Sequence, residues 1–158
     1  MDLKQFLKTL PAFERFAPEH LDVLSELMEV SSHRAGQKFI VQGQQGDAMF
    51  LLMEGAVQTT HVDEVTGVVH EARDLHAGEI FGLLSLVEDM PASWTSVAGE
   101  PVTVAALGPD EFRELFRMAP PIAYHLQYMI AVQLARNLQE RNRQLRELLQ
   151  TRAAAAAT

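Results

Sequence analysis

The 158-residue sequence contains no cysteine. This absence excludes disulfide scaffolds, cysteine-ligated zinc, iron–sulfur clusters, and catalysis or redox sensing by a thiol. Long apolar runs are missing too, and the opening MDLKQFLKTL places charged residues among its leucines. Neither a secretory signal peptide nor a membrane span fits these patterns. We therefore expect a soluble, cytoplasmic protein without membrane association.

Catalytic motifs are also missing. The sequence has no G-x-S-x-G elbow, no H-E-x-x-H pair and no P-loop, and Ser85 has no evident His and Asp companions. Six histidines are present without the spacing of metal ligands, although His61 and His70 flank the segment DEVTG and can meet across two strands. We predict that the protein is not an enzyme and has no catalytic residues and no metal site.

Positive charge is scarce and unevenly placed. The chain has 13 Lys and Arg against 21 Asp and Glu, a net charge of −8, which argues against nonspecific binding of nucleic acid. Residues 78–100 contain four acidic residues and no Lys or Arg, whereas residues 136–158 contain five arginines. These arginines are consistent with a solvated helix face, because the helix dipole favours positive charge near a helix C-terminus, or with a nucleic-acid contact. We take the solvated face and predict no nucleic-acid partner.

Hydrophobic periodicity changes twice along the chain. A short helix, a break at Pro11 and an amphipathic helix in APEHLDVLSELMEV come first. From about residue 31 the apolar segments become short, β-branched or aromatic, and are separated by Gly, Pro or Asp, which predicts antiparallel strands with a hairpin at DEVTG. Helical patterns return at PDEFRELF and after Pro120 and Pro121.

The last helix carries an apolar stripe with the 3,4 spacing of a coiled coil. Counting from Ala131, the stripe positions are Leu134, Leu138, Arg141, Leu145 and Leu148. A helix of about 30 residues spans about 45 Å and extends beyond a small domain. We therefore predict a parallel homodimer through this helix, with packing on its own domain as the alternative. The domains expected are 1–119, a β-roll with N-terminal helices and a short following helix; 120–152, the dimerisation helix; and 153–158, a frayed tail.

Two stretches, GQKFIVQGQQGDAMFLLMEGAVQ and GEIFGLLSL followed by PASWTSVA, resemble the cyclic nucleotide-binding domain family, of catabolite activator protein and protein kinase A regulatory subunit type. The resemblance covers roughly residues 10–150. The matching positions are Gly36, Ile40, Gly43 or Gly46, Asp47, Phe50, Leu52 or Met53, and Gly55. Glycines 43, 46 and 55 fall where strands reverse, and we expect a positive φ at each. The resemblance implies an α+β fold: an antiparallel β-roll, a jelly-roll-like double sheet, flanked by N-terminal helices and a long C-terminal helix.

The resemblance also implies a ligand cassette in which backbone N–H groups and an arginine hold a cyclic phosphate while a glutamate accepts the ribose 2′-hydroxyl. In this sequence Leu83 stands where the family has its glutamate, and Ala92 where it has its arginine. Trp94 replaces a small residue and is expected either to fill the vacated cavity or to stack on a base, of which we favour filling. The candidate ligand-binding residues are Phe81, Gly82, Leu83, Leu84, Ser85, Ala92, Ser93, Trp94 and, from a neighbouring strand, Arg73.

Three functions fit these observations. The first is a stand-alone regulatory domain, without a DNA-binding domain, that does not bind cAMP or cGMP in the usual way and acts through a protein partner or an atypical ligand. The second is a cyclic mononucleotide or dinucleotide sensor with a relocated phosphate contact at Arg73. The third is a purely structural dimerisation module. We predict no cofactor, although a haem-binding relative leaves His76 open as an axial ligand.

Overall fold

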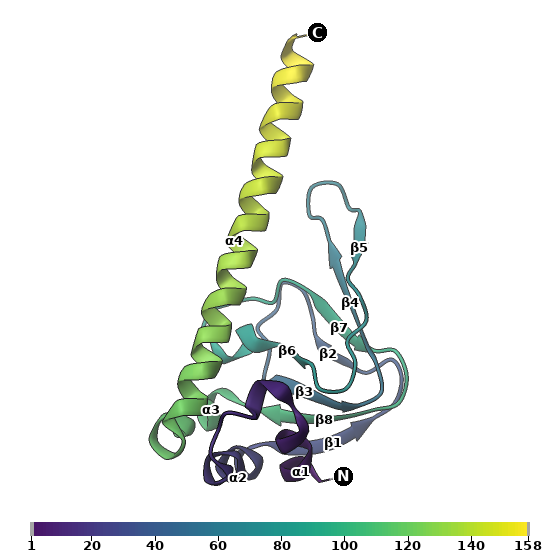
Figure 1. Ribbon diagram of the computed structural model, residues 1–158. Coiled ribbons are helices and arrows are strands. Elements are labelled where there is room, and N and C mark those ends of the chain that lie inside the picture. Colours follow the sequence, from purple (N-terminus) through teal and green to yellow (C-terminus); the bar gives the residue numbers. More distant parts are fainter. Residues whose placement is uncertain (1, 158) are drawn as a thin grey trace. The chain divides into compact units, whose positions relative to one another are not determined.

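The computed structural model describes residues 2–157. As the sequence predicts, helices come first, a region of mainly strands follows, and helices return at the end (Figure 1). The helices are α1 (Leu3–Thr9), α2 (Pro18–Leu27), α3 (Pro109–Met118) and α4 (Pro120–Ala157), with the 3-10 helices η1 (Pro11–Phe13) and η2 (Leu83–Leu86). The strands are β1 (Glu29–His33), β2 (Lys38–Ile40), β3 (Met49–Glu54), β4 (Val57–Val62), β5 (Val69–Glu71), β6 (Ile80–Phe81), β7 (Thr95–Ala98) and β8 (Val102–Leu107).

The chain forms two compact units that divide between His125 and Leu126, inside α4. The sequence analysis had placed the division after residue 119, at the Pro120–Pro121 break. It had also expected a frayed tail after residue 152, whereas α4 remains helical through Ala157. Alanine has the highest intrinsic helix propensity, which accounts for helix there without any packing partner.

The first unit contains two four-stranded sheets, with strand orders β1-β8-β3-β6 and β2-β7-β4-β5. Every strand pair is antiparallel, so the predicted β-roll is confirmed. Side chains on a strand alternate between two faces, and β8 is buried on both: Val102 and Val104 on one face, Ala105 and Leu107 on the other. The loop after β4 turns at Asp63, whose carboxylate accepts the N–H groups of Val65 and Thr66, as predicted for DEVTG.

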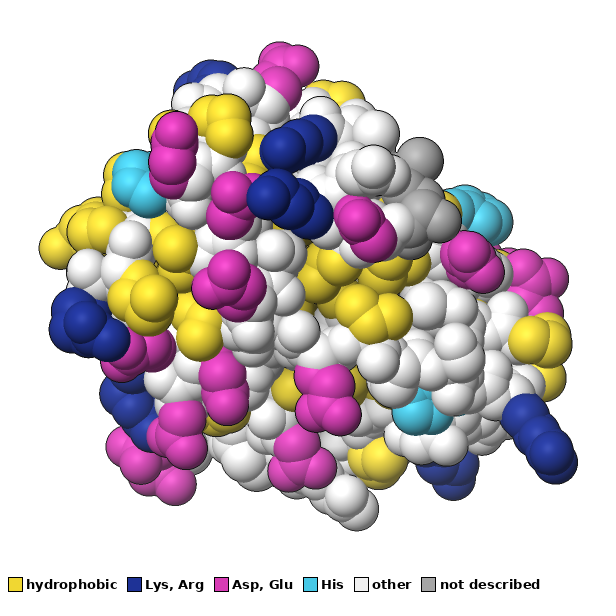
Figure 2. Space-filling view, turned by 90° about the horizontal axis from the view of Figure 1, so that it is seen from below, with side chains coloured by type: hydrophobic (Ala, Val, Ile, Leu, Met, Phe, Trp, Pro, Cys, Tyr) yellow, Lys and Arg dark blue, Asp and Glu magenta, His cyan; other side chains and the backbone are white. Residues whose placement is uncertain are grey.

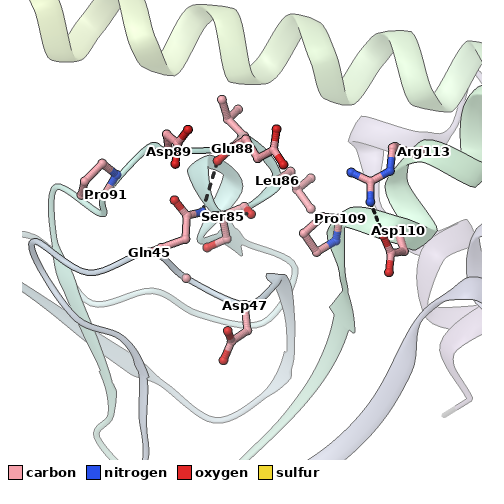
Figure 3. A pocket seen from close by; sticks show the side chains of 12 residues that line it. Gln45, Asp47, Ser85, Leu86, Glu88, Asp89, Pro91, Pro109, Asp110 and Arg113 are labelled. Atoms are coloured by element: carbon pink, nitrogen blue, oxygen red, sulfur yellow. Dashed lines mark hydrogen bonds and ion pairs between the residues drawn. The ribbon is translucent and has the colours of Figure 1, made fainter.

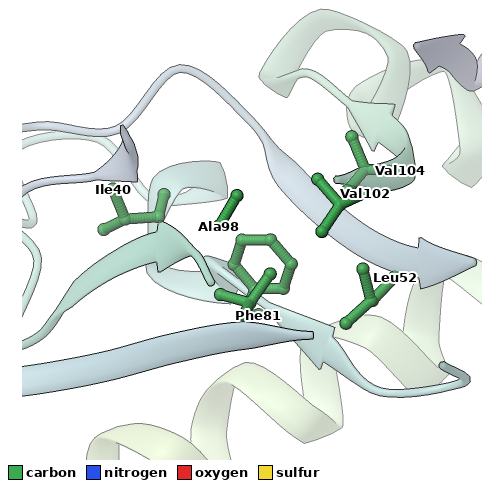
Figure 4. Close-up of a cluster of buried hydrophobic side chains, with 7 residues drawn as sticks. Ile40, Leu52, Phe81, Ala98, Val102 and Val104 are labelled. Atoms are coloured by element: carbon green, nitrogen blue, oxygen red, sulfur yellow. The ribbon is translucent and has the colours of Figure 1, made fainter. Parts of the chain in front are cut away.

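The interior of the roll is apolar (Figure 4). One cluster of buried side chains comprises Ile40, Leu52, Val57, Phe81, Ala98, Val102 and Val104. Phe39, Phe50, Leu75 and Ala92 pack against it while partly buried. Phe81 stacks on Phe50 with ring centroids 5.2 Å apart, which adds a preferred aromatic geometry to the apolar burial.

Two glycines turn the chain with positive φ as predicted, and a third is required for a different reason. Gly43 has φ +82° and Gly55 has φ +89°. The prediction of positive φ at Gly46 is wrong, because the positive-φ glycines do not include it. Its missing side chain instead lets the chain approach Ser85, since a Cβ on Gly46 would overlap the Ser85 hydroxyl and lie 3.2 Å from Ile40 Cδ1.

Replacing Gly55 with alanine is expected to cost more stability than the same change at Gly43. Both positions pay about 1–2 kcal/mol for a side chain at positive φ. At Gly55 the new Cβ would also overlap the Pro101 carbonyl and approach Val102 Cγ1 to 2.8 Å, whereas at Gly43 it meets nothing within 4 Å. Overpacking adds about 1–3 kcal/mol. Urea unfolding of both variants measures the difference, and equal losses would contradict the steric argument.

An aromatic contact holds the first turns of α4 within the first unit. The His125 ring lies 5.4 Å from that of Phe16 and 6.4 Å from that of Phe13, both approached edge-on. Burial lowers the pKa of His125 from its ordinary 6.5, and the positive charge of Arg15 lowers it further.

Because the folded-state pKa of His125 lies below its unfolded value, the unfolded chain binds more protons between the two values. The free energy of unfolding is therefore expected to fall as the pH drops through 6.5 toward the lowered pKa. His125→Phe keeps an aromatic ring and removes this titration. Urea unfolding at about pH 8 and pH 5 should show a shallower pH dependence for the variant than for the unaltered protein, and identical slopes would contradict the assignment.

The surface reflects the net negative charge of the sequence. On the face shown in Figure 2, the described acidic side chains are scattered among hydrophobic and neutral ones, and the basic ones form no continuous surface. The face shown lacks the basic stripe typical of nucleic-acid-binding domains. Within residues 2–157, no helix combines the length and the apolar character needed to cross a bilayer.

Candidate functional site

The predicted cassette begins where β6 turns sharply into η2. Gly82 makes this turn with φ +73°, and a Cβ there would lie 2.9 Å from Ile40 Cδ1 and 3.0 Å from the Ala48 carbonyl oxygen. Both the backbone conformation and the close packing therefore require glycine. The N–H of Ser85 then donates to the Gly82 carbonyl at 3.0 Å, which closes the short helix.

The side chains of this segment are largely apolar and point into the protein. Phe81 belongs to the core cluster, and Leu84, Ser85 and Leu86 are buried, while Leu83 is half-buried. The predicted cassette residues 81–85 thus lie together at one turn. A leucine at position 83 offers no acceptor to a ligand hydroxyl.

Ala92 occupies the second critical position and packs against the core cluster. Two backbone hydrogen bonds fix it: its N–H donates to the Gln44 carbonyl at 2.9 Å, and its carbonyl accepts the Gly43 N–H at 2.8 Å. The position where the resemblance implies a phosphate-binding arginine therefore carries a methyl group that packs on apolar side chains. A phosphate there would lose hydration without gaining a cation.

Trp94 lies beside the β4–β5 hairpin. Its ring centroid is 5.5 Å from that of His61, and His61 Nδ1 lies 2.8 Å from the Ser93 carbonyl oxygen. His61 pairs with His70 across the strands, with ring centroids 6.3 Å apart, as their flanking positions predicted. Trp94 is half-buried and lies outside the core cluster. Its ring contact with His61 is a contact with the hairpin. In the part of the chain described, no three His, Asp or Glu side chains are grouped to hold a metal ion.

Arg73 already has a partner. Its guanidinium forms an ion pair with Glu79, and the other Glu79 oxygen accepts the His76 N–H at 2.7 Å. The hydrogen bond from Arg73 lowers the pKa of Glu79. Sequence reasoning missed this pair, although an arginine and a glutamate on either side of the His76 turn were a usable signal. A phosphate contact through Arg73 would have to leave Glu79 without its cation.

Comparisons with known proteins agree with this geometry. Residues 30–118 match the family model described as "Cyclic nucleotide-binding domain". The chain is 30% identical over 141 residues to the cyclic AMP receptor protein of Thermus thermophilus, a match that covers 88% of this chain and 62% of that protein. It is 31% identical over 123 residues to a cAMP-dependent protein kinase regulatory subunit of Aspergillus fumigatus, covering 78% of this chain and 29% of that protein.

Among solved structures, the chain is similar to the catabolite activator protein of Thermus thermophilus, with a TM-score of 0.70 and 28% identity. That match covers 87% of this chain and 62% of the solved chain. The chain thus spans less than two thirds of the length of these relatives. The resemblance inferred from the glycine pattern and the cassette is confirmed.

Proposed function

Because this chain belongs to the cyclic nucleotide-binding domain family, we propose that it is a non-enzymatic regulatory domain whose cassette does not hold cAMP or cGMP in the usual way. In this proposal it acts through a protein partner or an atypical ligand. The observation that carries the proposal is the apolar packing of Ala92 at the position where the resemblance implies an arginine. Leu83 supports it, since the hydroxyl acceptor is missing as well.

Leu83 and Ala92, in place of the glutamate and arginine that the resemblance implies, are expected to lower the free energy of nucleotide binding substantially. A hydrogen bond to a charged group contributes about 1.5–3 kcal/mol, and a buried hydroxyl left without a partner costs about 1–3 kcal/mol more. The low ends for both positions give at least about 4 kcal/mol, which is about a thousandfold in dissociation constant. A micromolar site would become a millimolar one.

The alternative sensor, with its phosphate contact at Arg73, is less well supported. Arg73 is paired with Glu79, and its side chain is 72% exposed. Recruiting it would unpair Glu79 and require a neutralising group that residues 78–100 do not contain. The ion pair therefore favours the first proposal over the second.

The proposal includes a homodimer formed through α4. Leu138 is 61% exposed and Leu145 is 54% exposed in the single chain. The ion pairs of Arg143 with Glu140 and Glu147 lie at positions that a heptad places away from the stripe. An apolar stripe with charges on the opposite side is the pattern of a coiled-coil partner surface.

The experiment that tests the ligand proposal is isothermal titration of the full chain with cAMP and with cGMP. No binding tighter than about millimolar is expected, by the arithmetic above. Micromolar binding of either nucleotide would overturn the proposal and would make Arg73→Gln the next variant to measure.

A further inference from the structure

Two histidines meet on the hairpin formed by β4 and β5. His61 of β4 and His70 of β5 are directly opposite each other in the antiparallel pair, and their rings are stacked with centroids 6.3 Å apart and planes at 26°. Opposite residues of two paired strands share a face of the sheet, so both imidazoles lie on the same side of the hairpin. Imidazole nitrogen suits Zn²⁺, Cu²⁺ and Ni²⁺ as a ligand. The pair therefore offers two ligands of one kind to a transition-metal ion.

A hydrogen bond to the backbone determines which nitrogen of His61 is available to a metal. His61 Nδ1 lies 2.8 Å from the Ser93 carbonyl oxygen. A carbonyl oxygen only accepts hydrogen bonds, so Nδ1 carries the hydrogen and the lone pair of the neutral ring lies on Nε2. Metal-binding histidines are held in this way, by donating the other ring N–H to a carbonyl or carboxylate. This contact is independent of the ring pairing and makes Nε2 the candidate metal ligand.

The hairpin around the pair is negatively charged. Residues 62–71 contain no Lys or Arg and three acidic residues, Asp63, Glu64 and Glu71. Backbone hydrogen bonds within the turn, chiefly that from Thr66, lower the pKa of Asp63, and the charge of His70 lowers it further. The Asp63 carboxylate thus lies close enough to the pair to interact with a charge there. This environment favours a cation beside the imidazoles over an anion.

The two rings need only a small adjustment to share an ion. Metal–nitrogen bonds of about 2.0–2.1 Å place the ring centroids of two imidazoles on one tetrahedral ion about 5 Å apart. His70 is exposed and lies on the edge strand of its sheet, so its side chain can rotate toward His61 without disturbing the core. Within residues 2–157 no third His, Asp or Glu joins them in a group that could hold an ion, which leaves the other coordination positions to water.

We propose that His61 and His70 together bind one divalent transition-metal ion, with His61 coordinating through Nε2. Among these ions Cu²⁺ is expected to bind most tightly, because affinity along the series rises to a maximum at copper. The ion links β4 to the edge strand β5 and lies beside Trp94, whose ring centroid is 5.5 Å from that of His61. The spacing of histidines along the sequence did not predict this site, because strand pairing creates it.

The test uses the full chain without an affinity tag and Cu²⁺ as the probe, at about pH 7.5, above the ordinary pKa of a histidine side chain. Cu²⁺ quenches the fluorescence of a nearby indole, and Trp94 is the single tryptophan of the chain. Quenching is expected to saturate at one ion per chain, with a dissociation constant below about 0.1 mM. Weaker binding would overturn the proposal.

His70→Gln removes one ligand and leaves the contact of His61 with Trp94 in place. Losing a residue that merely supports a metal ligand costs about 10–100-fold in affinity, so losing a ligand should weaken Cu²⁺ binding at least about tenfold. His76→Gln is the matched control, because it removes one exposed histidine elsewhere and should leave the affinity within about twofold. Equal losses in the two variants would show general binding to histidine and overturn the proposal.

The pocket in Figure 3 provides a control for general attraction of cations. It is enclosed by the loop between β2 and β3, by the residues that follow η2 and by the start of α3, and its described lining contains carboxylates and no histidine. Carboxylates suit Mg²⁺, Ca²⁺ and Mn²⁺. The variant Asp47→Asn/Glu88→Gln/Asp89→Asn removes three of these charges and should leave the Cu²⁺ affinity within about twofold. A loss as large as that of His70→Gln would contradict the site.

Two further measurements keep the result independent of folding and of quenching. Excess Cu²⁺ should raise the melting temperature of the unaltered protein more than that of His70→Gln, because the folded hairpin alone brings the two ligands together. Electron spin echo spectroscopy of the Cu²⁺ complex should detect two bound imidazoles in the unaltered protein and one in His70→Gln. A single imidazole in the unaltered protein would overturn the proposal.

The metal site goes beyond the proposed function and does not depend on it, since neither histidine belongs to the predicted cassette. Titration with cAMP therefore keeps the two proposals apart. Micromolar cAMP binding would overturn the proposed function and leave the metal site standing. Failure of the Cu²⁺ experiments would overturn only the metal site.

Discussion

The double variant Leu83→Glu/Ala92→Arg is expected to bind cAMP or cGMP about a thousandfold more tightly than the unaltered protein, which moves the dissociation constant from about millimolar to micromolar. The backbone at both positions has a defined conformation in the unaltered protein. Gly82 makes the turn, and two backbone hydrogen bonds hold Ala92. The double variant adds the two side-chain charges that the resemblance implies. Calorimetry measures the gain, with Trp94→Ala added in a second background to provide room if the ring obstructs the nucleotide.

The single variant Leu83→Glu serves as the control for this gain. An unpaired carboxylate on this turn, between Gly82 and the buried Leu84, must either lose hydration or take up a proton. It is expected to lower the melting temperature without conferring nucleotide binding. A double variant that folds normally and still fails to bind would show that Leu83 and Ala92 are not the cause of the missing affinity.

A second large effect is expected for Leu138→Asp, which should convert a dimer into a monomer at micromolar concentration. In a parallel coiled coil the change places two carboxylates at the seam, one from each chain. Leaving a buried charge unpaired costs about 3–5 kcal/mol, so the dimer should dissociate at least a hundredfold more readily. Sedimentation equilibrium measures this constant directly.

Gln139→Asp is the matched control for Leu138→Asp. It introduces the same residue one position along, on the side of the helix that a heptad turns away from the seam. Gln139 is exposed, so the change should leave the dimer intact. The dimer prediction fails if the unaltered protein is monomeric, or if both variants behave alike.

Much of the fold was predictable because short apolar, β-branched or aromatic segments bounded by Gly, Pro or Asp mark buried strands. β3 and β8 are such segments and were identified, whereas β1 was missed because its sequence EVSSH is mostly polar and remains exposed or half-buried. β6 was missed because a strand of two residues is too short to show a periodic pattern of apolar side chains. Tertiary pairing, with Phe81 opposite Phe50, creates that strand.

The cassette was predictable in outline and less so in its contacts. Glycine spacing located the turns, but at Gly46 the requirement is close packing on Ser85, a contact between positions far apart in the sequence. The pairing of Arg73 with Glu79 and the packing of His125 against two phenylalanines depend on how neighbouring elements meet. Local patterns report the residue types that a position accepts, and they do not report its neighbours across the fold.

The loop between β2 and β3 is shared by the two faces of the cassette. Gly43 and Gln44 hold the backbone of Ala92 on one side, while Gln45 holds Val87 and Met90 on the other. Any ligand whose binding moves this loop would act on both sets of contacts at once, and such coupling acts equally in both directions.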